Sequence, residues 1–219
     1  MPTVARRAKA GRGSPFWILS SGFWILLLAA CDSDSPFVFF DDFNRPDGTP
    51  GPNWWTEEAG APFISGNRLC SDDTRGAITP FSVEGKKAKV SFKFSAVASA
   101  GLQAFVLSDD DYDVENGTWA AGLAADGALF SLIIAQSEQG VFAVGPSVNV
   151  SPGIPYLLEA VFDAGSILVK LFQENGTLMD QIAFTPAPVV HANYFGLGIG
   201  RVADGHLTYA DDFRIEVLE

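Results

Sequence analysis

Alternation of apolar and polar residues predicts β-strands along most of this chain. In residues 87–95 every second residue is apolar, and lysines and serines fill the positions between. Because successive side chains of a strand point to opposite faces, such a segment buries one face and exposes the other. Residues 213–217 repeat the pattern near the C-terminus. In residues 167–172 both faces are apolar, since Leu168 and Phe172 lie opposite the main apolar face, which predicts a strand covered on both sides.

Turn signals separate these apolar runs. Asn-Gly and Asp-Gly pairs suit turns that need a positive φ, and they begin at Asp47, Asn116, Asp126, Asn175 and Asp204. No segment shows an amphipathic helix with start and stop signals. The regular spacing of runs and turns predicts an all-β domain, a sandwich or barrel, over residues 37–219.

The first 30 residues have the character of an export signal. A basic stretch ends at Arg12, and residues 16–30 carry no charge. This apolar run is shorter than the roughly 20 residues that a transmembrane helix needs. A basic start, a short apolar run and small residues at its end predict a signal peptide over residues 1–30.

The end of this signal, Leu28-Ala-Ala-Cys31, resembles the lipobox of bacterial lipoproteins. The resemblance implies that the Cys31 thiol takes a diacylglycerol and becomes the new N-terminus. Residues 31–36 would then be the lipidated cysteine and a short tether, with the domain held on a membrane in the bacterial cell envelope, facing the periplasm or exterior. Two or three acyl chains would make this attachment stable. The alternatives are an ordinary signal peptide or an uncleaved anchor helix.

Charge and cysteine usage narrow the function classes. Without residues 1–30 the chain keeps 10 of its 14 Lys and Arg residues and all 26 Asp and Glu residues, a formal net charge of −16. Such a surface repels nucleic acid, so no nucleic-acid partner is expected. If Cys31 carries lipid, Cys70 stands alone, which excludes an intrachain disulfide and a thiolate metal cluster. The domain must therefore depend on its hydrophobic core.

The two ends of the domain echo each other, in Phe40-Asp-Asp-Phe-Asn44 and Tyr209-Ala-Asp-Asp-Phe-Arg214. Pairing of the first and last strands would bring these ends together. With the middle of the chain, they resemble the concanavalin A-like, or laminin G-like, jelly-roll superfamily of lectins and glucanases. Four segments carry the resemblance: residues 41–55, 63–71, 155–172 and 194–218. It implies a two-sheet antiparallel sandwich with one concave face where relatives hold glycans, although a fold alone does not give a function.

An acidic run at Asp111-Tyr-Asp-Val-Glu115 is the candidate for catalysis. It resembles the Glu-x-Asp-x-Glu strand of some glucanases in this superfamily, in which alternation puts all three acids on one face. A retaining glycosidase needs its two carboxyl groups about 5–5.5 Å apart. Here the first position is Asp111, so only Asp113 and Glu115 match. The polar neighbours of the run equally fit a solvated acidic loop.

Two binding sites of other kinds are also implied. Relatives hold a structural Ca²⁺ near the first and last strands, and Asp42 and Asp211 are the candidate ligands. Ca²⁺ takes six to eight oxygen ligands, and both aspartates could instead cap strand ends. Tyr112, Glu115 and Trp119 would make a sugar patch, because sugar rings stack on aromatic faces while carboxylates hold their hydroxyls.

Three functions follow from these observations. The leading hypothesis is a lipid-anchored, non-enzymatic binding module, with carbohydrate as its ligand. The second is an envelope glycoside hydrolase that uses Asp113 and Glu115. The third is a structural or adhesive surface protein, for which an exposed apolar patch at Leu168 and Phe172 would be evidence.

Overall fold

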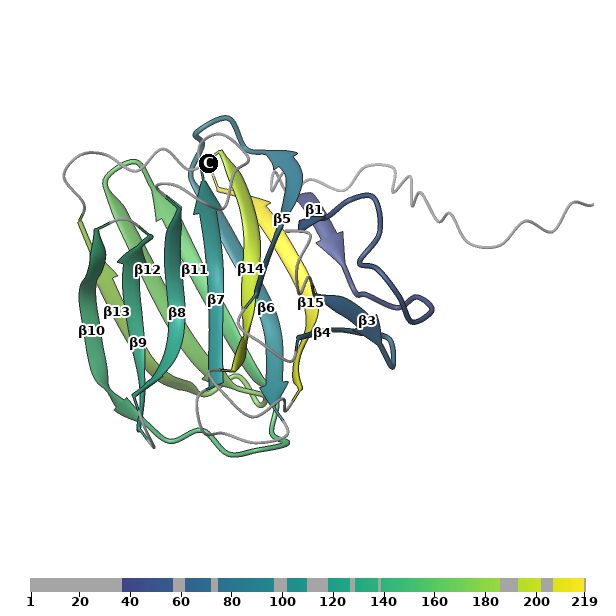
Figure 1. Cartoon of the computed structure of the whole chain (residues 1–219). Helices are drawn as coiled ribbons and strands as arrows, with labels where there is room; N and C mark the ends of the chain where they lie inside the picture. The colour runs from purple at the N-terminus through teal and green to yellow at the C-terminus, as the bar shows by residue number, and fades with distance from the viewer. Residues whose placement is uncertain are drawn as a thin grey trace, which may run out of the picture. The chain divides into compact units, whose positions relative to one another are not determined.

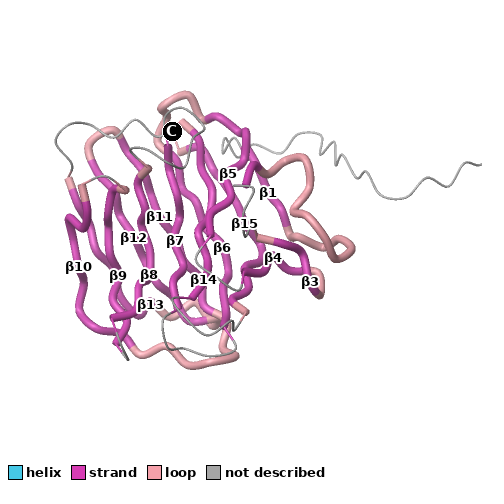
Figure 2. Tube along the Cα trace, viewed as in Figure 1, coloured by secondary structure: helices cyan, strands magenta, loops and turns pink. Residues whose placement is uncertain are grey.

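The computed structural model describes residues 37–56, 62–71, 75–96, 102–109, 118–126, 129–137, 139–185, 193–201 and 207–218. The signal peptide, Cys31 and the tether lie outside them. Within the described residues the secondary structure consists of strands and loops, with no helix (Figure 2). No helix in this part of the chain is therefore long and apolar enough to span a bilayer.

The strands form two antiparallel sheets that pack face to face (Figure 1). The eight-stranded sheet has the order β13 (Leu178–Phe184), β12 (Ser166–Gln173), β11 (Tyr156–Asp163), β6 (Ala88–Ala96), β15 (Thr208–Val217), β4 (Arg68–Ser71) and β3 (Phe63–Ser65), and β1 (Phe37–Asp41) also pairs with β15. The seven-stranded sheet has the order β10 (Gly140–Val148), β9 (Leu129–Gln136), β8 (Trp119–Asp126), β7 (Leu102–Asp109), β14 (Tyr194–Arg201), β5 (Arg75–Ser82) and β2 (Trp55–Thr56). The predicted all-β sandwich is confirmed.

Strict alternation positions the side chains of the eight-stranded sheet. In β6 the apolar residues Ala88 to Ala96 are buried at every second position, and the lysines and serines between them face outward. The same period-two burial runs through β11 and β12. Leu168 and Phe172 are half-buried on the outer face of β12. The prediction that this strand is covered on both sides is therefore wrong, because its second face remains partly open to water.

Large apolar side chains from both sheets fill the space between them. The fully buried aromatic residues are Phe43, Phe92, Phe94, Phe162, Phe195 and Phe213. Phe162 of β11 and Phe195 of β14 meet across the sandwich, with ring centroids 5.1 Å apart. Burial of each such side chain contributes roughly 1.5–3 kcal/mol relative to exposure, so this core supplies the stability that a domain without a disulfide needs.

The first and last strands of the domain lie side by side, as their echoing sequences predict. Phe40 is opposite Arg214 and Asp41 is opposite Phe213. A register shift between Asp211 and Arg214 interrupts the pairing of β15 with β6, and Asp212 within it has a φ of 51°. This β-bulge bends β15 at the point where β1 joins it.

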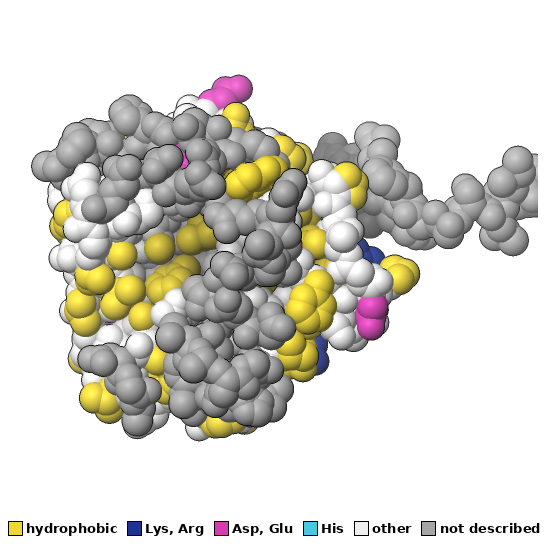
Figure 3. Space-filling view, viewed as in Figure 1, with side chains coloured by type: hydrophobic (Ala, Val, Ile, Leu, Met, Phe, Trp, Pro, Cys, Tyr) yellow, Lys and Arg dark blue, Asp and Glu magenta, His cyan; other side chains and the backbone are white. Residues whose placement is uncertain are grey.

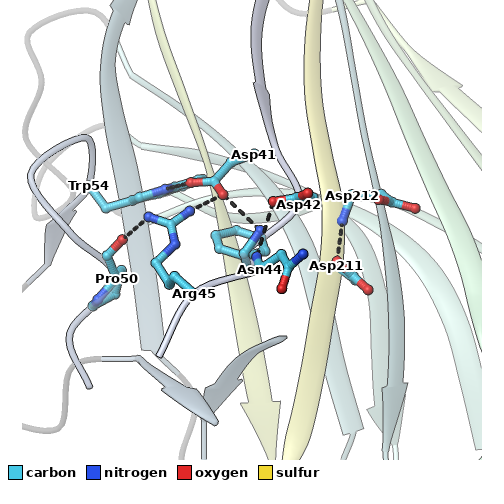
Figure 4. A network of polar contacts seen from close by, with 9 residues as sticks. Asp41, Asp42, Asn44, Arg45, Pro50, Trp54, Asp211 and Asp212 are labelled. Carbon is cyan, nitrogen blue, oxygen red and sulfur yellow. Dashed lines mark hydrogen bonds and ion pairs between the residues drawn. The ribbon is translucent and has the colours of Figure 1, made fainter. Parts of the chain in front are cut away.

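A buried polar network fixes the loop that follows β1 (Figure 4). Asp41 is 7% exposed, and its carboxylate accepts hydrogen bonds from the Trp54 indole N–H at 2.7 Å and from the Phe43 amide at 2.8 Å. It also pairs with the Arg45 guanidinium, which donates a hydrogen bond to the Pro50 carbonyl at 2.6 Å. The Trp54 ring then packs edge-on against Phe213, with centroids 5.0 Å apart. Asp41 thus ties the opening segment to the core.

Candidate functional site

The outer face of the seven-stranded sheet is built from glycine, alanine and larger apolar residues. One row across the strands places Leu107 between Gly196 and Ala120, and the next row places Phe105 between Gly198 and Gly122. Figure 3 shows apolar side chains gathered over β8, β9 and β10 on this face. Sugar hydroxyls need hydrogen-bond donors and acceptors, which apolar side chains cannot supply. The described part of this face therefore offers contact area but little polar recognition.

One end of this face carries a buried acid. Asp109, at the end of β7, is 3% exposed, and its carboxylate accepts a hydrogen bond from the Thr118 hydroxyl at 2.5 Å. Tyr194 of β14 lies opposite Asp109 in the ladder. The hydrogen bond between Asp109 and Thr118 joins the two residues that flank the connection formed by residues 110–117.

The acidic run that the sequence singled out belongs to this connection. Asp111, Tyr112, Asp113 and Glu115 lie outside the described residues. Their assignment to catalysis or to a sugar patch stays a prediction. Glu115→Gln tests the hydrolase alternative, since that alternative requires the loss of all activity on a β-glucan.

Trp119, the third member of the expected sugar patch, is a core residue. It is 9% exposed, and its ring centroid lies 5.3 Å from that of Phe142 in β10 and 6.0 Å from that of Phe184 in β13. Alternation along β8 places Trp119 on the same side as the buried Ala121 and Leu123. Instead of presenting its face to a ligand, the indole fills the space between the two sheets.

The expected calcium ligands hold backbone amides of their own loops (Figure 4). Asp42 accepts a hydrogen bond from the Asn44 amide at 3.0 Å, and Asp211 accepts one from the Asp212 amide at 2.9 Å. Burial raises the pKa of Asp211, and the bond from the Asp212 amide opposes this shift. Among the described residues no three Asp, Glu, His or Cys side chains converge on one point. The assignment of Asp42 and Asp211 to a calcium site therefore stays a prediction.

Exposed apolar side chains gather on β10 rather than at Leu168 and Phe172. Val141 is 57% exposed and Val144 is 65% exposed. β10 is the edge strand of the seven-stranded sheet, and its register with β9 shifts twice. Such irregularities discourage edge-to-edge pairing with another sheet.

A cavity of about 230 Å³ opens on the eight-stranded sheet. Four of its lining residues are charged, and one is an aromatic residue that a cation covers. The guanidinium carbon of Arg68 lies 3.9 Å from the centroid of the Tyr209 ring, close enough for a cation–π contact. The lining consists of Arg68, Lys93, Phe94, Ser95, Pro155, Glu174, Tyr209, Ala210 and Asp211.

Strand register explains why these residues meet. Tyr209 is opposite Ser95 of β6 on one side and Cys70 of β4 on the other, and Asp211 is opposite Lys93. Because Phe94 and Ala210 are buried, the residues on either side of them point to the outer face. The turn between β12 and β13 adds Glu174 at the rim of the cavity. We name this site the Arg68–Tyr209 cavity.

Charges of both signs line this cavity. Arg68 and Lys93 supply two cations, and Glu174 and Asp211 supply two carboxylates. A hydrogen bond to Asp212 at 2.7 Å raises the pKa of Lys93, so its ammonium stays charged over the physiological range. The cavity lining therefore presents both hydrogen-bond donors and acceptors, and its Lys93 ammonium is shared with Asp212.

Comparison with known proteins gives a fold but no sequence relative. No family model matches the chain, and no curated protein matches it. Among solved structures it is similar to a seed lectin of Lotus tetragonolobus, with a TM-score of 0.62 and 12% identity over 83% of this chain and 99% of that one. The fold is concanavalin A-like.

Two further solved structures are similar to this chain in fold. Lectin II from Ulex europaeus has a TM-score of 0.61 and 14% identity, over 84% of this chain and 100% of that one. The CBM2 module of the evolved Dit protein of Lactobacillus casei BL23 phage J-1 has a TM-score of 0.61 and 10% identity, over 84% of this chain and 96% of that one. At such low identity the likeness concerns the fold, and function must be argued from the site.

Proposed function

We propose that this domain is a carbohydrate-binding module and that the Arg68–Tyr209 cavity holds a neutral sugar. The observation that carries the proposal is the lining of the cavity, in which an aromatic ring, two carboxylates, two cations and the Ser95 hydroxyl surround about 230 Å³. Similarity in fold to lectins and to a carbohydrate-binding module supports it.

The chemistry of the cavity suits a polyhydroxylated ligand. Each sugar hydroxyl can donate and accept a hydrogen bond, so recognition requires both kinds of partner. The carboxylates of Glu174 and Asp211 accept, whereas Arg68 and Lys93 donate. The Tyr209 ring holds the Arg68 guanidinium in place by a cation–π contact and leaves the rest of its apolar surface for the C–H groups of a sugar. Because Glu174, Asp211 and the neighbouring Asp212 are acidic, a neutral sugar is preferred over an acidic one.

We expect Tyr209→Ala to weaken binding to a neutral polysaccharide by at least about tenfold, since it removes both the aromatic surface and the support for Arg68. The measurement is affinity electrophoresis of the full-length chain in detergent against laminarin, mannan and galactan. Glu174→Gln should also weaken binding, because an amide is a poorer acceptor than a carboxylate.

Lys170→Ala is the matched control for these variants. It removes a cation from the same face of the same sheet, where Lys170 pairs with Glu159 at 3.5 Å, outside the cavity lining. Its retardation should equal that of the wild-type chain. Retention of full affinity by Tyr209→Ala, or no retardation of the wild-type chain by any of these polysaccharides, would contradict the proposal.

The second part of the proposal concerns the cellular setting. Residues 1–31 have the features of a lipoprotein signal, so we place the domain in the bacterial cell envelope, attached to a membrane through acyl chains on Cys31. Cys31→Ser should move the protein from the membrane fraction to an unprocessed or soluble form in a bacterial host. Mass spectrometry of the N-terminal peptide checks this, and an unmodified Cys31 thiol in the wild-type protein would refute it.

A further inference from the structure

A second cavity adjoins the first on the eight-stranded sheet. It has a volume of about 320 Å³ and is lined by Ile154, Tyr156, Gln173, Glu174 and Asn175. Glu174 lines both cavities. Glu174 therefore borders two adjoining spaces rather than one.

Hydrogen bonds of the β12–β13 turn hold this dividing residue in place. The Gln173 amide donates to the Thr177 carbonyl at 2.9 Å, and the Gly176 amide donates to the Gln173 carbonyl at 2.9 Å. The Asn175 side chain accepts a further bond from the Thr177 amide at 2.9 Å. Hydrogen bonds within the chain therefore define the turn that carries Glu174.

The opposite wall is equally well supported. The Ser151 amide donates to the Tyr156 hydroxyl at 2.9 Å, and the Gly153 amide donates to the Ala96 carbonyl at 2.8 Å. These bonds hold the segment that carries Ile154, which is 47% exposed, and Pro155, which lines the first cavity. Both cavities are therefore features of the folded domain.

From this geometry we infer that the site takes two consecutive units of a neutral polysaccharide, one in each cavity, with the Glu174 carboxylate bound to hydroxyls of both units. The inference rests on the proposed function and names the ligand more closely. The side-chain amide of Gln173 supplies a hydrogen-bond donor and an acceptor for the second unit, and Ile154 supplies apolar contact. An acidic unit is disfavoured, because Glu174 would repel it in either cavity.

Binding of two linked units is stronger than binding of one. Once the first unit is held, the second is at a high effective concentration in the adjoining cavity. We expect the disaccharide of whichever polysaccharide binds to have at least about tenfold higher affinity than its monosaccharide, and the tetrasaccharide to add little more. Isothermal titration calorimetry of the full-length chain measures all three.

A pair of variants separates the two cavities. Gln173→Ala should weaken disaccharide binding about threefold to tenfold and leave monosaccharide binding unchanged, since its side chain lines the second cavity alone. Tyr209→Ala should weaken both. Gln173 is exposed at the end of β12, so its truncation should not lower the melting temperature.

The two-unit site and the proposed sugar binding can fail separately in these experiments. Equal affinity for the mono- and disaccharide, or an equal loss of both with Gln173→Ala, overturns the two-unit site while leaving sugar binding intact. If no saccharide of any length binds, the proposed function itself fails, and this inference fails with it.

Discussion

Gly196→Ala is expected to destabilise the domain by about 3 kcal/mol or more, because two strands meet too closely at Gly196 for any side chain. A Cβ atom there would lie 2.0 Å from the Ala77 carbonyl oxygen and 2.7 Å from the Ile78 Cα of β5. Both obstacles are backbone atoms, so no rotamer change relieves the clash. For a domain of this size the melting temperature should fall by roughly 6–12 °C, measured by circular dichroism.

Gly165→Ala is the control for this experiment. Gly165 lies in the turn between β11 and β12, nothing lies within 4 Å of the position of its Cβ, and its φ is not in the left-handed region. Alanine there should be neutral or stabilise slightly, because it restricts the unfolded chain without strain. Equal losses in the two variants would mean that close strand approach does not explain the effect at Gly196.

Asp41→Ala should cost about 3 kcal/mol of stability, the second large effect. The substitution leaves the Trp54 indole N–H and the Arg45 guanidinium without their shared carboxylate. Loss of one partner from a buried pair is costly because the other remains desolvated, although Arg45 keeps 28% exposure and recovers part of the cost in water. Urea denaturation followed by tryptophan fluorescence reports both the stability and the environment of Trp54.

Asp42→Ala provides the comparison at the next position. Asp42 is exposed and accepts one exposed hydrogen bond, from the Asn44 amide. Its removal should change the stability by less than about 1 kcal/mol. A loss as large as that of Asp41→Ala would show that general charge, and not the buried network, stabilises the opening loop.

The strands and the fold class could be predicted from the sequence because burial on one face leaves a period of two. Residues 87–95 have that pattern without exception, and they form β6. The Asn175-Gly176 pair likewise predicts a turn. In the structure Gly176 has a φ of 82° and lies in the hairpin between β12 and β13. Echoing acidic ends pointed to the pairing of β1 with β15.

Burial is harder to predict for strands that lack a clear alternation of apolar and polar residues. In β12 both faces are apolar in sequence, and only the structure shows that Leu168 and Phe172 face partly into water. β10 is apolar yet largely exposed, because an edge strand has fewer neighbours to cover it. Apolar composition alone does not report which neighbour, if any, covers a strand.

The sequence does not predict the Arg68–Tyr209 cavity, because the residues that line it come from strands far apart along the chain. Arg68 and Tyr209 are separated by most of the chain, and only the pairing of β4 with β15 brings them into contact. Lys93 and Tyr209 each belonged to segments that the sequence singled out as strands, but no local pattern joins them. Conversely, the position of Trp119 beside an acidic run suggested a sugar patch, whereas alternation along β8 directs this residue into the core.

The pairing of β1 with β15 also sets where the tether of a lipid-anchored form would join the domain. β1 begins at Phe37, opposite Glu216, whereas the Arg68–Tyr209 cavity lies at Tyr209, near the other end of β15. Seven steps of extended chain, roughly 20 Å, separate those points. If Cys31 carries lipid as proposed, the tether would join the domain at the Phe37 end, and this distance would leave room for a polymer at the Arg68–Tyr209 cavity.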